Sequence, residues 1–155
     1  MPSRRQQISM SPEEVDAFLA VTRTLNVATI GPSGHPHLAA MWYGFLDGKV
    51  AFWTFGKSQK ILNLRRDPKV SALAEEGTTY ETLKGVELVG QGRIIEDRDA
   101  IIAIALSVAG RHTGPAALTA EARPFIEAQA AKRVGVVIDV ERVMSWDHTK
   151  LGGTY

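Results

Sequence analysis

The chain has 155 residues, a length that suits one domain with a substantial core, and we expect a single domain over residues 1–155. Hydrophobic residues make up 45% and charged residues 23%, which is ordinary for a globular protein and excludes disorder along the whole chain. The formal net charge of +1 does not favour nucleic acid or an anionic membrane as a partner, and the absence of cysteine excludes disulfides, zinc thiolate sites and cysteine nucleophiles.

No stretch of the sequence reaches the roughly 20 apolar residues that a membrane-spanning helix needs. The polar N-terminus is followed by no apolar run of the kind found in a signal peptide. We therefore expect a cytoplasmic protein with no membrane span.

The first part of the chain predicts an arm, a helix and three strands. Residues 1–10 are polar and predict a loose arm. Ser11, Pro12 and Glu14 form the pattern of a capping box, which predicts a helix from residue 11 to about 22. Three apolar runs joined by turn residues predict strands over 25–30, 37–45 and 50–55. Asp47-Gly48 between the last two is a strong hairpin signal.

The second part of the chain predicts three helices and three strands. A short helix ends before Pro68, and a longer one ends at Gly110, a residue type that often follows a helix. Thr119 can cap the third helix. In chain order we expect a helix over 58–66, strands over 69–75 and 86–96, a helix over 97–109, a loop over 111–118, a helix over 119–132, a strand over 134–143 and a polar tail over 145–155. About six strands, mostly joined by hairpins, favour a mainly β fold: a six-stranded antiparallel barrel with peripheral helices.

Several common enzyme motifs are missing. The sequence has no G-x-G-x-x-G after a strand, no P-loop, no H-E-x-x-H and no G-x-S-x-G. His35 and His37 are close in sequence but lack a third ligand nearby, so we predict a solvated turn there and no metal site. The absence of a protein nucleophile fits a binding module and equally fits an enzyme whose organic cofactor carries the reaction.

The most informative segment is an aromatic hairpin that leads into the short helix over 58–66. Lys57, Ser58 and Lys60 lie at the start of that helix. Free N–H groups and the positive end of the helix dipole suit an anion such as phosphate. The alternative stays open that both lysines are solvated and Ser58 is only an N-cap. The aromatic residues Trp42, Phe52 and Trp53 can likewise belong to the core or to a subunit interface.

Six segments together resemble a known family. They are Leu25–Ile30, Gly34-His35-Pro36-His37, Phe52-Trp53-Thr54, Lys57-Ser58-Gln59-Lys60, Asn63-Leu64-Arg65-Arg66-Asp67-Pro68-Lys69-Val70-Ser71 and Gly85–Gly92. The sequence from Leu25 to Trp146 is similar to the pyridoxamine 5′-phosphate oxidase-like, FMN-binding split-barrel superfamily. Within it, the flavin/deazaflavin oxidoreductases of the B branch are the most similar. The Asn-Leu-Arg-Arg-Asp-Pro segment is the most specific part of this resemblance.

The resemblance implies a six-stranded split barrel that forms a homodimer, with two cofactor sites between the subunits. In this sequence Lys60 would bind the cofactor phosphate, with Lys57 and Ser58 beside it. The residues Met41, Trp42 and Tyr43 would border the flat ring, while Thr54 and Phe55 would line the ribityl chain. The partner subunit would close the cleft with Trp146, His148 and Lys150, and Tyr80 is a further candidate for lining it.

The resemblance also implies a reaction. The leading hypothesis is an oxidoreductase that uses reduced coenzyme F420 to transfer hydride to an unsaturated small-molecule substrate, with FMN as the alternative cofactor. A third hypothesis is a protein that binds a flavin, a deazaflavin or haem without turnover, with His112 or His148 as an iron ligand. The C-terminal sequence Lys150–Tyr155 lacks the added basic residues that hold pyridoxine phosphate in the oxidase, so vitamin B6 oxidation is not expected. Catalytic residues, and the roles of His35, His37 and His112, are not assigned from the sequence.

Overall fold

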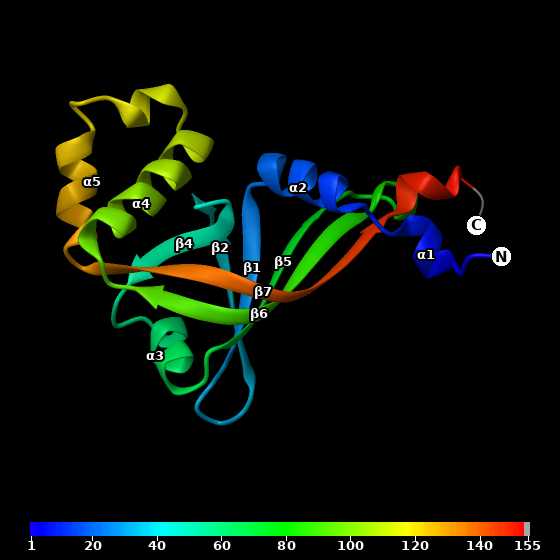
Figure 1. Cartoon of the computed structure of the whole chain (residues 1–155), viewed down its shortest axis with the longest axis horizontal. Coiled ribbons are helices and arrows are strands. Elements are labelled where there is room, and N and C mark those ends of the chain that lie inside the picture. The colour runs from blue at the N-terminus through cyan, green and yellow to red at the C-terminus, as the bar shows by residue number, and fades with distance from the viewer. Residues whose placement is uncertain (154–155) are drawn as a thin grey trace.

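The computed structural model describes residues 1–153. Its strands form one antiparallel sheet in the order β2-β1-β5-β6-β7-β4-β3, which curls into a half barrel with helices around it (Figure 1). The mainly β fold with peripheral helices is thereby confirmed. The strands are β1 (Thr24–Ile30), β2 (Pro36–Trp42), β3 (Gly44–Leu46), β4 (Lys49–Phe55), β5 (Lys69–Glu76), β6 (Lys84–Ile95) and β7 (Arg133–Asp147).

The strand count is seven where the sequence predicted six. The run predicted as one strand over 37–45 divides at Tyr43, so that β2 pairs with β1 while β3 pairs with β4. Asp47 and Gly48 form the tight β3–β4 turn, and both have positive φ angles, 50° and 77°. This is the hairpin that the sequence indicated.

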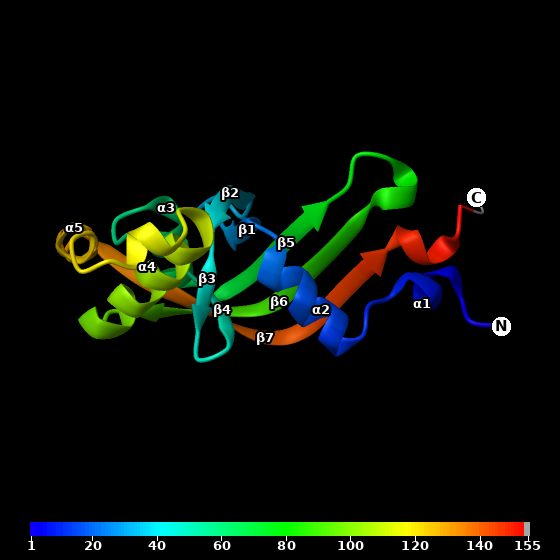
Figure 2. The ribbon, with the colours of Figure 1, turned by 90° about the horizontal axis from the view of Figure 1, so that it is seen from above.

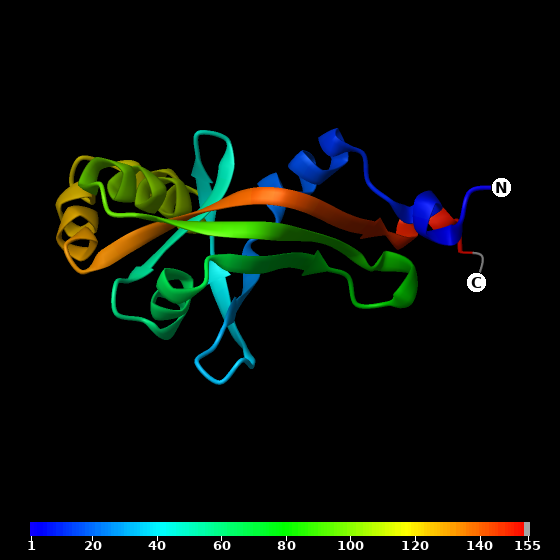
Figure 3. The same ribbon diagram turned by 60° about the horizontal axis from the view of Figure 1, so that its bottom comes forward.

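The helices lie around the sheet. They are α1 (Arg4–Ile8), α2 (Pro12–Val21), α3 (Gln59–Arg66), α4 (Arg98–His112) and α5 (Arg123–Ala130), with the 3-10 turns η1 (Tyr80–Thr82), η2 (Pro115–Leu118) and η3 (His148–Leu151). In Figure 2, α4 and α5 lie at one end of the molecule, and α1 and η3 lie at the opposite end. The long β6–β7 ribbon connects these two ends (Figure 3).

One large apolar core and two smaller ones explain why the sheet has this shape. The larger core fills the inside of the half barrel, where Phe18 and Leu19 of α2 pack with Phe52 and Ile138. The smaller cores lie on the outer face of β4 and β7, beneath α4 and α5. Because both faces of β7 are covered there, residues 134–138 form an unbroken buried run and do not alternate with polar residues.

Four element boundaries differ from the sequence prediction. The arm predicted as loose contains α1, because Ser3 and Gln6 form a capping box. The helix predicted to end at Gly110 continues to His112, and the positive φ angle falls on Gly114 (86°). The helix predicted from Thr119 begins at Arg123. The last strand runs to Asp147, four residues beyond its predicted end, because β6 pairs with it that far.

Among residues 1–153, no helix combines the length and the apolar character that crossing a membrane would require.

Candidate functional site

The candidate site begins where β4 passes into α3. The Gly56 N–H donates to the Lys132 carbonyl, and the Ser58 N–H donates to the Phe55 carbonyl, so this turn is fixed to the end of the sheet. Ser58 is the N-cap of α3 by position, yet its side chain makes no capping hydrogen bond. Its Oγ is buried and has no partner within residues 1–153. An unpartnered buried hydroxyl is costly unless something else satisfies it.

Lys60 lies in the first turn of α3, and its side chain is half-buried. Its Nζ donates to Thr54 Oγ1 at 3.3 Å. Burial lowers the pKa of Lys60 from its usual value, because desolvation disfavours the charged form. No carboxylate within the described part of the chain forms an ion pair with Lys60 or with the exposed Lys57. The start of α3 therefore presents positive charge and a spare hydroxyl without a counter-ion.

The rest of α3 holds this start in place. Ile61 and Leu64 are buried in the main core. The fully buried Asn63 donates from Nδ2 to Thr29 Oγ1 at 3.0 Å, and Arg66 donates to the Ile30 carbonyl. The Asn-Leu-Arg-Arg segment thus docks the helix on β1, which fixes the direction in which its N–H groups point.

Two strand edges are not paired within the described part of the chain. Within residues 1–153, β2 pairs only with β1, and β4 pairs only with β7 beyond Ala51. Trp42 at the end of β2 and Phe55 at the end of β4 are exposed by 58% and 53%. Met41 is half-buried against the core, and Thr54 is buried with its hydroxyl directed at Lys60. The backbone groups of these edges are able to bind a flat polar ring.

Tyr43 occupies a different place from its predicted neighbours. Its side chain is fully buried, and its hydroxyl donates to the Leu19 carbonyl at 2.6 Å. Its own carbonyl accepts a hydrogen bond from Arg111 Nε at 3.0 Å. Tyr43 is thus a core residue that joins β3 to α2 and α4, and its side chain does not line a site.

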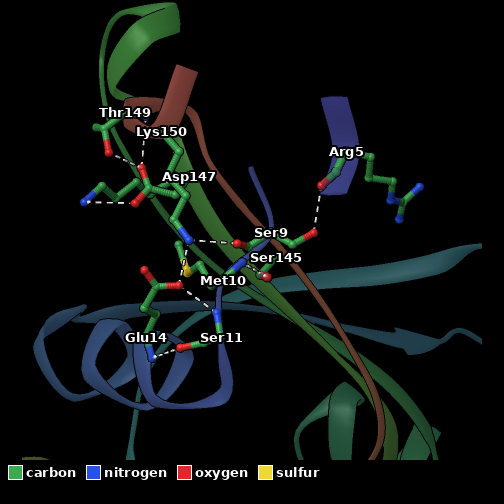
Figure 4. A network of polar contacts seen from close by, with 10 residues as sticks. Arg5, Ser9, Met10, Ser11, Glu14, Ser145, Asp147, Thr149 and Lys150 are labelled. Carbon is green, nitrogen blue, oxygen red and sulfur yellow. Dashed lines mark hydrogen bonds and ion pairs between the residues drawn. The ribbon is translucent and has the colours of Figure 1, made fainter. Parts of the chain in front are cut away.

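The residues predicted to wall the cleft lie far from α3 in the same chain. Tyr80 and His148 contact each other, with 4.5 Å between ring centroids and 2.7 Å from His148 Nδ1 to the Tyr80 carbonyl. Lys150 forms an ion pair with Glu14 at 2.7 Å and donates to the Ser9 carbonyl (Figure 4). Trp146 covers Gly85 across the β6–β7 ribbon. This group lies at the end of the ribbon that carries the termini, and the structure does not bring it to Lys60.

Within residues 1–153 no group of three histidine or acidic side chains is close enough together to hold a metal ion. His112 stacks on Trp42, with ring centroids 4.4 Å apart and planes at 4°. Burial and then the neighbouring Arg111 lower the pKa of His112 from its usual value, because both disfavour the charged imidazolium.

Arg133 is a residue near the site that the sequence reasoning missed. Its guanidinium lies over the rings of Phe55 and Trp53, at 4.4 and 4.7 Å from their centroids. Its backbone pairs with Phe55 directly before the turn that carries Lys57. A cation at the start of a strand that pairs with the aromatic hairpin is the signal that could have identified it.

The fold is a curled antiparallel sheet, and at the start of α3 it presents a cation without a counter-ion and a hydroxyl without a partner, an arrangement that suits an anionic ligand. The chain matches the family model described as pyridoxamine 5′-phosphate oxidase over residues 11–147, and it belongs to this family of split barrels. A search of curated proteins found no match.

Solved structures extend the comparison. A conserved hypothetical protein, Rv2991 from Mycobacterium tuberculosis, is 47% identical with a TM-score of 0.92, over 99% of this chain and 95% of that one. A structure described as an F420 reductase is 27% identical with a TM-score of 0.66, over 86% and 98%. HutZ, a haem storage protein from Vibrio cholerae, is 16% identical with a TM-score of 0.65, over 85% and 92%, a likeness of fold alone.

Proposed function

We propose that this protein is an oxidoreductase that binds coenzyme F420 and transfers hydride to an unsaturated organic substrate. The observation that carries the proposal is the start of α3, where the half-buried Lys60 has no carboxylate partner and the buried Ser58 hydroxyl has no partner within residues 1–153. A phosphate would satisfy both groups. The 27% identity to a structure described as an F420 reductase supports the choice of cofactor.

The remaining site residues receive complementary roles. Thr54 holds the Lys60 ammonium in place, and Lys57 adds a second, solvent-exposed positive charge. The free edges of β2 and β4 supply backbone N–H and C=O groups for a ring beside Met41 and Trp42, and Phe55 lies on the path between ring and phosphate. Tyr43 contributes only indirectly, because its contact with the Leu19 carbonyl holds the end of β2 in place.

The bound cofactor would supply the redox chemistry. When bound, reduced coenzyme F420 would supply one hydride for a carbon of the substrate double bond, and solvent would supply the proton for the other carbon, so that two electrons would reach the substrate. The contribution of the protein is to hold both partners in a reactive orientation. This fits the sequence, which lacks the common motifs that carry a protein nucleophile.

FMN is the alternative cofactor, because it shares the phosphate and the three-ring system. The test is a fluorescence titration of the purified protein with each cofactor. Tighter binding of coenzyme F420 supports the proposal. Tighter binding of FMN indicates that the same site serves an FMN-dependent enzyme. Tight binding of either with no reductase activity over a broad substrate panel indicates a carrier protein. A haem-type absorption spectrum indicates a haem protein, although the burial of His112 Nε2 argues against that residue as the iron ligand.

The residue test is Lys60→Ala, with Lys69→Ala as the matched control. Loss of a charge-assisted hydrogen bond of about 1.5–3 kcal/mol weakens cofactor binding roughly 10- to 100-fold. Lys69 is exposed and lies 3.7 Å from Asp67, so its loss leaves binding unchanged. Circular dichroism checks that both variants are folded. Parental affinity of Lys60→Ala for coenzyme F420 and for FMN would show that the site is assigned wrongly.

We further propose that the protein works as a homodimer. The outer face of β1, β2, β5 and β6 carries a groove of about 540 Å³ with small apolar side chains, including Ala28, Ala40 and Leu73. A second copy on this face can bring its Tyr80, Trp146, His148 and Lys150 to a site that one chain leaves open. Sedimentation should show a dimer at micromolar concentration, and Ala28→Glu should shift it toward monomer. A parental protein that sediments as a monomer contradicts the dimeric site.

A further inference from the structure

A second feature of the molecule is an apolar pocket on the outer face of β4. It lies between that strand and the layer formed by α4, η2 and α5, and its volume is about 740 Å³, within the range of small-molecule sites. Ala109 of α4 and Ala117 of η2 leave this space open because their side chains are small. Phe125 at its margin is 69% exposed, which is unusual for so large an apolar side chain. We call it the α4–α5 pocket.

The walls of the α4–α5 pocket are aromatic on the side of the sheet. Trp42 and Trp53 both line it, and the stacked ring of His112 holds the Trp42 indole in a fixed plane. Aromatic faces of this kind favour a flat ligand, because stacking adds to the burial of apolar area. The pocket therefore selects for planar ring systems.

One positive group lies at the pocket wall with no acidic neighbour. Arg133 lines the pocket with its guanidinium over Trp53, and it donates from Nη1 to the Gln129 carbonyl at 3.3 Å. None of the residues lining the pocket is acidic, and no carboxylate within residues 1–153 forms an ion pair with Arg133. An arginine donor fork matches the two oxygens of a carboxylate. The charge of the pocket thus complements an organic acid.

The α4–α5 pocket also adjoins the proposed ring position. Trp42 belongs to both, since it ends β2 beside Met41 and also lines the pocket. On the other side, the guanidinium of Arg133 contacts Phe55, the last residue of β4 before the α3 turn. A molecule bound in the pocket would lie next to the cofactor ring.

We propose that the α4–α5 pocket binds a planar aromatic carboxylate, with its rings against Trp42 and Trp53 and its carboxylate on Arg133. The role of this ligand as hydride acceptor rests on the proposed function, but its binding does not require the cofactor. The proposal therefore names a substrate class for the enzyme and can be tested separately from it.

The test is a ligand-observed NMR titration of the full chain, without cofactor, using 2-naphthoate and its neutral counterpart 2-naphthylmethanol at neutral pH. We expect 2-naphthoate to bind about tenfold more tightly, the ratio that one charge-assisted hydrogen bond supplies. Ala109→Phe, which fills the pocket, and Arg133→Met, which removes the charge, should each weaken 2-naphthoate binding at least about tenfold. If Ala109→Phe does not fold, Ala117→Phe is used in its place.

Two matched controls keep the test specific. Ala103→Phe places the same ring on the exposed face of α4, and Arg98→Met removes an exposed arginine from the same helix. Both should bind 2-naphthoate like the parent. The proposal is overturned if the parent does not bind 2-naphthoate, if the neutral alcohol binds equally well, or if Ala109→Phe and Arg133→Met bind like their controls. Cofactor titration of the same samples separates this failure from a failure of the cofactor site.

Discussion

Arg111 is expected to make a large contribution to stability, and Arg111→Met tests this. Its side chain leaves the last turn of α4 and donates to four backbone carbonyls, those of Leu19, Ala20, Thr22 and Tyr43. Its guanidinium also lies over the rings of Tyr43 and Phe45, at 4.6 and 4.9 Å. One side chain thus joins the end of α2, the β2–β3 junction and the helix that walls the α4–α5 pocket.

The size of the effect follows from these contacts. Each hydrogen bond from a charged donor contributes about 1.5–3 kcal/mol when it cannot be replaced. Replacement is partial here, because the Leu19 carbonyl keeps the Tyr43 hydroxyl and the Ala20 contact is exposed, where water can substitute. We therefore expect a loss of about 3 kcal/mol, the value of one or two such bonds. In a chain of this length that lowers Tm by roughly 6–12 °C.

The assay is thermal and urea unfolding followed by far-UV circular dichroism. Arg123→Met is the matched control, since it removes an exposed i,i+4 pair with Glu127 at 2.8 Å. Such a pair contributes only about 0.3–0.5 kcal/mol, so the control should melt within about 2 °C of the parent. If Arg111→Met melts as close to the parent as the control does, the carbonyls it contacts are satisfied without it and the reasoning is wrong.

Three further predictions concern packing and charge. A Cβ built on Gly44 lies 2.9 Å from the Val108 nitrogen of α4, so Gly44→Ala should destabilise the fold by about 1–3 kcal/mol in urea titrations. Arg93 and then Lys49 lower the pKa of Asp139 to about 2, so these contacts stabilise the fold above the unfolded-state pKa, and this stability is lost as pH falls from about 4 to 2. Since the groups are exposed, Asp139→Asn should cost under about 1 kcal/mol at neutral pH and clearly less at pH 2, where about half of the Asp139 side chains are protonated, and an undiminished cost there would contradict the assignment. Finally, bound phosphate should raise the lowered pKa of Lys60, which NMR titration of its Cε can follow; an unchanged pKa places the anion elsewhere.

The fold was predictable to a large extent because its signals are local. The Asp47-Gly48 turn and the Ser11 capping box depend on residues within four positions of one another, and both form as expected. The end of α4 was not predictable in this way. The helix passes Gly110 because Arg111 finds its partners on α2, about 90 residues away in sequence. Local propensity carries no information about such a contact.

The candidate site was likewise predictable only where its residues are close together in the sequence. Ser58 and Lys60 share a short helix start, so their grouping could be inferred from spacing alone. Tyr43 could not be placed, because the strand breaks at that position and its ring turns into the core to reach the Leu19 carbonyl. The α4–α5 pocket also escaped notice. Alanines from separate elements form much of its helical side, and small residues give no sequence signal until the chain has folded around an empty volume.

The separation of the two ends of the β6–β7 ribbon has a practical consequence for labelling. The elements α1 and η3 lie at one pole, while α3, which carries Lys60, and the helices α4 and α5, which wall the α4–α5 pocket, lie toward the other pole (Figure 1). An affinity tag or fluorophore fused to either terminus therefore begins remote from the cavity of its own chain. If the chains pair as proposed, the same fusion would crowd the neighbour's cavity, and untagged protein is the appropriate sample for ligand titrations.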